Sequence, residues 1–160
     1  MSMLATGNLK GRFQNNLGNV LADEWSNAVN TEAFEKGDIL VVAKSGGDSG
    51  KFKRATSADT GPFYFCKEAK ALADTRVYTL SKPGQRVSVV TDDTLTPACR
   101  VKAGTTPGRV MKLVEGTDSS DKAVGIYMFI SANIPMGGAG TAITNATAGT
   151  VVDIDLKGAM

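Results

Sequence analysis

Short runs of alternating apolar and polar residues, separated by glycine turns, follow one another along most of the chain. In one such run, Val87 and Val89 alternate with Arg86 and Ser88. A period of two places successive side chains on opposite faces of a β-strand. The pattern therefore predicts strands over residues 38–44, 51–55, 62–67, 75–80, 85–91, 98–103, 108–114, 123–130 and 150–156.

Turn residues separate these candidate strands at regular intervals. Gly46–Gly47, Pro83–Gly84 and Pro107–Gly108 are examples, and glycine and proline favour tight turns because one tolerates positive φ and the other fixes φ. A spacing of about ten residues between strands is typical of a β-sandwich or a β-barrel. We therefore predict an all-β fold, a small barrel or sandwich of short antiparallel strands.

The N-terminal part of the chain has a sparser apolar pattern. We predict an extended N-terminal arm and a β-barrel or β-sandwich domain, over residues 1–36 and 37–160 respectively. The spacing of six residues could form one face of a short helix: Val20, Leu21, Glu24, Trp25, Ala28 and Val29. Two interpretations stay open: the arm packs its only tryptophan on its own domain, or the arm reaches a neighbouring subunit.

A glycine-rich segment, residues 131–148, interrupts the last two candidate strands. Long loops in compact domains are often functional or disordered, so we interpret it as a loop at the rim of the domain, either a subunit contact or a surface insertion. The residues that we predict to bind a partner are Val20, Leu21, Trp25, Val29, Pro135 and Met136.

The alternation also predicts which side chains form the core. Asp153 and Asp155 alternate with apolar residues, and we expect them on the solvated face of the last strand, where they would protect an edge from aggregation. The predicted core includes Val41, Val87, Val89, Val110, Ile126, Val152 and Ile154.

Composition agrees with a globular protein without strong electrostatic preferences. Hydrophobic residues make up 42% of the chain and charged residues 21%, with a net charge of +2, so no nucleic-acid partner is expected. The longest apolar run is far short of the ~20 residues of a membrane helix, and the N-terminus lacks a signal-peptide pattern. We therefore expect no membrane partner and a protein made in a cytoplasm, in which Cys66 and Cys99 are small buried residues rather than a disulfide.

The chain contains no histidine, and this limits its chemistry. A Gly-Asp-Ser-Gly sequence around Ser49 resembles a serine-protease motif, but that mechanism needs a histidine base, so Ser49 is predicted to lie in a hairpin turn. Two cysteines without histidine do not fill a structural zinc site. We predict that the chain is not an enzyme and uses no cofactor and no metal ion.

The order of these segments resembles the capsid decoration, or cement, proteins of tailed phages and related viruses. The matching pieces are Gly37–Asp38, Ala55–Asp59, Ala103–Gly104, Val124–Gly125 and Gly149–Leu156. The resemblance implies a virion structural protein that binds the outer surface of an assembled capsid and stabilises it. It also implies the major capsid protein as partner, a homo-oligomer with a trimer favoured, and assembly in the host cytoplasm.

Two other hypotheses remain open. A carbohydrate- or receptor-binding domain of a virion fibre could use aromatic stacking platforms from Phe63, Tyr64, Phe65, Tyr78, Tyr127 and Phe129. An enzyme with a carboxylate pair, drawn from Asp92, Asp93, Glu68 and Glu115, is the third hypothesis.

Overall fold

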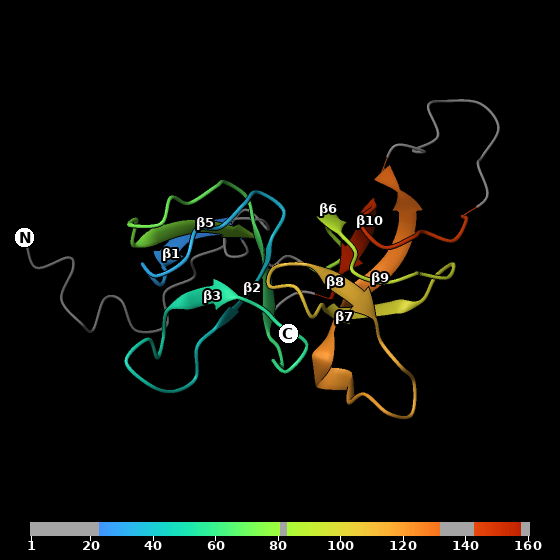
Figure 1. The fold of residues 1–160 in the computed structure, drawn as a ribbon, viewed down its shortest axis with the longest axis horizontal. Coiled ribbons are helices and arrows are strands. Elements are labelled where there is room, and N and C mark those ends of the chain that lie inside the picture. The colour runs from blue at the N-terminus through green and yellow to red at the C-terminus, as the bar shows by residue number, and fades with distance from the viewer. Residues whose placement is uncertain (1–22, 81–82, 132–142, 158–160) are drawn as a thin grey trace, which may run out of the picture.

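The structure is a computed structural model that describes residues 23–80, 83–131 and 143–157. In these residues the chain forms ten strands in two antiparallel five-stranded sheets, with one short 3-10 helix, Ser120–Lys122. Figure 1 shows the two sheets side by side, the first built from the N-terminal half and the second from the C-terminal half. The all-β prediction is confirmed, and neither sheet is a fully paired barrel. No helix in the described ranges is long and apolar enough to cross a membrane.

The strands of each sheet are consecutive in the chain. The first sheet has the order β1-β5-β4-β2-β3 and the second the order β6-β10-β9-β7-β8. Their bounds are β1 Asp23–Asn27, β2 Ile39–Val42, β3 Phe52–Arg54, β4 Phe63–Cys66, β5 Arg76–Leu80, β6 Arg86–Val90, β7 Arg100–Ala103, β8 Val110–Lys112, β9 Ala123–Ile130 and β10 Val151–Leu156.

Every strand predicted from the alternation is present, and the structure adds β1. The helical interpretation of the segment around Trp25 is wrong, because Asp23–Asn27 is a strand that pairs with β5, with Trp25 opposite Tyr78. The next residues, Ala28 and Val29, are buried at 2% and 3% exposure. Within the predicted arm, β1 therefore pairs with β5, and Ala28 and Val29 pack in the β structure. The boundary between arm and domain at residue 36 stays a prediction.

The two sheets share one topology. Counted from its own first strand, each sheet has the order first, fifth, fourth, second, third. In each sheet a parallel bridge links the two edge strands just after the first strand ends, between Ala28 and Phe52 in one and between Thr91 and Val110 in the other. Each sheet thus curls until its edges meet at one point.

A second pair of bridges repeats in the same way. Phe34 and Lys70 exchange backbone hydrogen bonds of 3.0 and 2.9 Å, and Leu95 and Ala146 exchange bonds of 2.9 and 3.0 Å. Both bridges join the loop after the first strand to the loop before the fifth strand. We therefore describe the chain as two structural repeats, the first unit (residues 23–80) and the second unit (residues 83–157).

Backbone conformation repeats at the turn that enters the second strand of each unit. Gly37 follows Phe34 by three residues and has φ 100°; Ala98 follows Leu95 by three residues and has φ 58°. Ala98 is the one non-glycine residue with positive φ in the described ranges. Positive φ is unusual for alanine. Ala98 adopts it at the position where the first unit has Gly37.

Each unit has an apolar interior formed from matching positions. The first interior contains Ala28, Val29, Phe34, Leu40, Phe52, Cys66 and Val77. In the second unit, the positions that match Phe34, Leu40, Phe52, Cys66 and Val77 are occupied, in this order, by Leu95, Val101, Val110, Tyr127 and Val152. These five residues of the second unit are at most 1% exposed.

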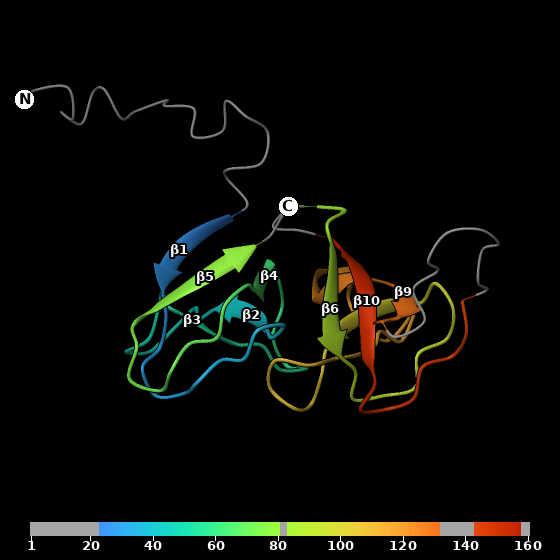
Figure 2. The same ribbon diagram turned by 90° about the horizontal axis from the view of Figure 1, so that it is seen from above.

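A second apolar contact joins the two units. Ile39, Val41 and Phe65, on the side of the first sheet opposite to its interior, belong to the same cluster as Val87 and Val89 of β6. Figure 2 places β6 on the side of the second unit that faces the first. We call this contact the joint. Burying apolar surface stabilises the folded state by about 25 cal/mol per Å². The apolar contact at the joint therefore stabilises one arrangement of the two units.

The structure corrects two of the predicted placements. The other predicted core residues are buried, but Ile126 is 43% exposed. Asp153 is 4% exposed rather than solvated, and it accepts hydrogen bonds from Ser88 Oγ at 2.7 Å and Ser131 Oγ at 2.6 Å. β10 lies between β6 and β9 and is not an edge strand, so protection of an edge does not explain its aspartates.

Candidate functional site

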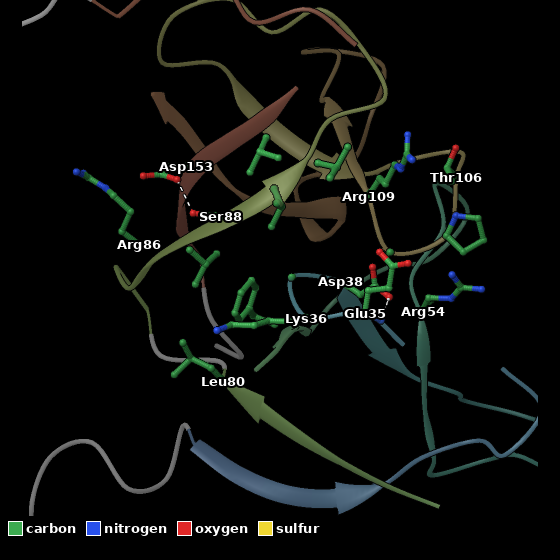
Figure 3. A pocket seen from close by; sticks show the side chains of 18 residues that line it. Glu35, Lys36, Asp38, Arg54, Leu80, Arg86, Ser88, Thr106, Arg109 and Asp153 are labelled. Atoms are coloured by element: carbon green, nitrogen blue, oxygen red, sulfur yellow. Dashed lines mark hydrogen bonds between the residues drawn. The ribbon is translucent and has the colours of Figure 1, made fainter. Parts of the chain in front are cut away.

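A groove with a volume of about 600 Å³ lies between the two units. All five residues of β6 line it, together with the turn before β2, the turn before β8 and the ends of β4 and β5. Figure 3 shows Ser88, Asp153 and Arg86 on the second-unit side and Glu35, Asp38 and Arg54 on the first-unit side. The groove exists because two curled sheets meet side by side and leave space beside the joint.

Arginines line the groove, and each is held by a carboxylate. Arg86 Nε lies 2.8 Å from Asp155 Oδ1, and Arg54 Nε lies 3.1 Å from Glu32 Oε2. Arg109 makes a longer ion pair of 3.4 Å with a buried carboxylate, Asp92. The groove therefore has mixed charge and no concentrated positive or negative field.

Asp38 is the carboxylate with the most perturbed surroundings in the groove. Its Oδ2 accepts a hydrogen bond of 2.8 Å from the amide of Glu35. Burial raises the pKa of Asp38 above its ordinary value, against the lowering effect of that hydrogen bond and of Arg54. A raised pKa and a groove are features of some functional sites, but here Asp38 also has a structural position at the joint.

Gly108 shows how tightly the units meet beside Asp38. Its carbonyl accepts from the amide of Ile39 at 2.7 Å, and its own amide donates to Ala55 O at 3.0 Å. With φ 85°, a Cβ placed on Gly108 would lie 2.5 Å from Asp38 Oδ1. Glycine is thus required here both by backbone conformation and by close approach.

The residues predicted to bind a partner do not form one site in the described part of the chain. Val20, Leu21, Pro135 and Met136 lie outside the described residues. Trp25 lies in β1, and Val29 is 3% exposed within the interior of the first unit, covered by its own chain. Their role in partner binding stays a prediction. The groove was not predicted, because no local sequence pattern shows how two units meet.

The proposed stacking aromatics are mostly engaged within the fold. Phe63, Phe65 and Tyr127 are buried, and the Tyr127 hydroxyl donates to Thr144 O at 2.6 Å. The guanidinium of Arg86 lies 5.3 Å from the centre of the Phe129 ring. Phe65 is 8% exposed and lines the groove.

The other candidate chemistry resolves into structural roles. Ser49 lies in the turn between β2 and β3, where its amide donates to Gly46 O at 3.1 Å. Cys66 and Cys99 are free, and burial raises the pKa of the Cys66 thiol to about 12. In the described ranges, no three acidic or cysteine side chains gather as a metal site would require.

The chain is thus an all-β protein in which two five-stranded units are joined side by side. A solved structure is similar in fold: the N base of the head fiber gp8.5 in bacteriophage phi29, with a TM-score of 0.52 and 16% sequence identity. The match covers 86% of this chain and 96% of that chain. At this identity the likeness concerns the fold alone. No protein-family model matches the chain, and no curated protein matches it.

Proposed function

We propose that the chain is a structural protein of a phage virion that attaches to the outside of the head. The observation that carries the proposal is the fold likeness to the base of a phage head fibre, which spans nearly all of that base. The segment order that resembles capsid decoration proteins points to the same location. The fold also suits the role, because attachment needs a rigid surface and no perturbed catalytic group.

In this role the major capsid protein is the partner, and several copies assemble on one particle, with a trimer favoured. Many weak contacts on a lattice give strong overall binding when geometry allows them to engage together. A protein that binds only the assembled shell shifts the equilibrium towards the shell, so stabilisation of the capsid follows from attachment. The N-terminal segment before β1 is our candidate for the contact.

Binding and stabilisation are tested with capsid shells of the virus that encodes the chain. The purified chain is mixed with shells, pelleted through a cushion and quantified, and the shells are then heated. We expect saturable co-sedimentation and a higher temperature of shell disruption. Absence of the chain from the pellet at saturating concentration contradicts the proposal.

The contact is tested with a chain that lacks residues 2–22 and keeps β1. Circular dichroism checks that the sheets form, and a chain with exposed Leu72 replaced by Ser is the control. We expect the truncated chain to remain folded and to lose co-sedimentation, while the control retains it. Full binding by the truncated chain contradicts a role for this segment.

The same likeness favours a second candidate, a domain of a virion fibre that binds a carbohydrate or receptor, because the similar structure belongs to a fibre. A glycan array separates the candidates. Specific glycan binding together with no binding to shells would favour the fibre domain.

A further inference from the structure

We propose that the outer end of the second unit is a latent self-association face, which polar residues keep from binding a second copy of the chain. The inference goes beyond the proposed function and rests on the two repeats alone. Two comparisons support it, each between one half of the joint and the matching positions of the other unit.

The joint uses one side of the first unit. Ile39 of β2 lies opposite Phe65 of β4, and the amide of Ala55 donates to Ile39 O at 2.8 Å. Ile39 and Ala55 are fully buried, and Phe65 is 8% exposed. Their burial in one cluster with β6 makes this side an apolar contact surface for a unit of the same fold.

The second unit has the same three positions, with different side chains. Arg100 of β7 lies opposite Ile126 of β9, and the amide of Leu113 donates to Arg100 O at 2.9 Å. Arg100 therefore occupies the position of Ile39, and Ile126 occupies the position of Phe65. Ile126 is 43% exposed, whereas Phe65 at the matching position is 8% exposed and belongs to the cluster of the joint.

Ion pairs hold the charged residues at this end. Arg100 pairs with Glu115, whose side chain is 66% exposed, at 2.5 Å. Lys102, at the position of Val41, pairs with Asp118 at 2.7 Å. Both carboxylates come from the loop between β8 and β9. Docking on this side would remove the exposed Arg100–Glu115 pair from water, and the desolvation of the two charges opposes docking.

The first strand of the first unit shows the same replacement. In the joint, β6 contributes Val87 and Val89, which lie opposite Ile154 and Val152. The matching positions of β1 are Glu24 and Ser26, opposite Thr79 and Val77. Positions that are apolar in the joint are thus polar or charged at the matching places of the other unit, apart from Ile126.

The test restores the side chains of the first unit at the outer end of the second. One variant is Arg100→Ile, which leaves Glu115 in water. The other combines Arg100→Ile, Lys102→Val and Asp118→Asn, so that position 118 is not left as a carboxylate without Lys102 and the amide of Val114 keeps its acceptor. The control is Lys51→Ile with Lys53→Val, which removes two ion-paired cations of the first unit.

Sedimentation velocity over a wide concentration range measures self-association, and hydrogen exchange maps it. We expect the combined variant to associate at least about tenfold more tightly than the parent and the control, with new amide protection in β7 and β9. Arg100→Ile shifts in the same direction and keeps the test decisive if the combined variant misfolds. Unchanged mass in a folded variant, equal association of the control, or protection of β7 and β9 in the parent that rises with protein concentration overturns the proposal.

Discussion

At the scale of single residues, Asp38 illustrates the cost of placing a carboxylate in the joint. Burial raises its pKa, so the folded state binds a proton more readily than the unfolded state. The ionised form therefore costs stability at neutral pH, and this cost shrinks as the pH falls below the folded pKa and is gone below the unfolded pKa. The hydrogen bond from the Glu35 amide offsets part of the cost.

We predict that Asp38→Asn raises the melting temperature at pH 7, because Asn keeps an acceptor for the Glu35 amide without a buried charge. The gain over the parent should shrink as the pH is lowered. Thermal unfolding at a series of pH values measures it. A gain that grows on acidification would contradict this account of Asp38.

A second prediction compares two isoleucines of the same sheet. Ile154 is fully buried and Ile126 is 43% exposed, although the sequence pattern predicted both as core. Truncating a fully buried isoleucine costs about 2–5 kcal/mol, since it removes apolar contact and leaves a cavity. We expect Ile154→Ala to fall in that range and Ile126→Ala to cost less than about 1 kcal/mol. Urea unfolding measures both, and equal losses would show that Ile126 is covered in solution.

At the scale of elements, two turns occupy matching places between the second and third strands of the units. Gly50 and Gly108 have φ of 84° and 85°. A Cβ on Gly50 would meet nothing within 4 Å, whereas one on Gly108 would meet Asp38. The same turn is thus free in the first unit and enclosed by the joint in the second.

We predict that Gly50→Ala costs about 1 kcal/mol, the backbone penalty for positive φ. Gly108→Ala should cost clearly more, because it adds a clash at the joint to the same penalty. Chemical unfolding of the two variants provides the comparison. Equal costs would mean that the turn before β8 does not contact the first unit closely.

The strands were predictable because their signal is local. A period of two and the turn residues identify β2 to β10 without any knowledge of partners. β1 was missed because Trp25, Ala28 and Val29 also fit a helical spacing, and pairing with β5 decides between the two. Propensity over so short a segment is weak compared with an available sheet edge.

The repeat and the groove were not predictable from one sequence. Matching positions share a location in the fold but seldom a residue: Gly37 corresponds to Ala98, and Lys70 to Ala146. Only the apolar character of interior positions is kept. The exposure of Ile126 depends on which side of the second sheet packs against other elements, and the burial of Asp153 depends on Ser88 and Ser131, which only the fold brings near.

At the scale of the whole molecule, one apolar cluster connects the interior of the second unit with the outer side of the first. We therefore predict that the two units unfold in a single transition. Tryptophan fluorescence reports on the first unit, since Trp25 is the only tryptophan, and hydrogen exchange reports on both. Coincident transitions are expected for a cooperative body, and a second unit that unfolds separately would contradict a stabilising joint.

Attachment to a phage head is the central claim, and electron cryo-microscopy of capsid shells with and without the added chain tests it most directly. The account predicts extra density on the outer surface of the shell, at symmetry-related positions, into which the two side-by-side units fit. Shells that show the same outer surface with and without a saturating amount of the folded chain would contradict it.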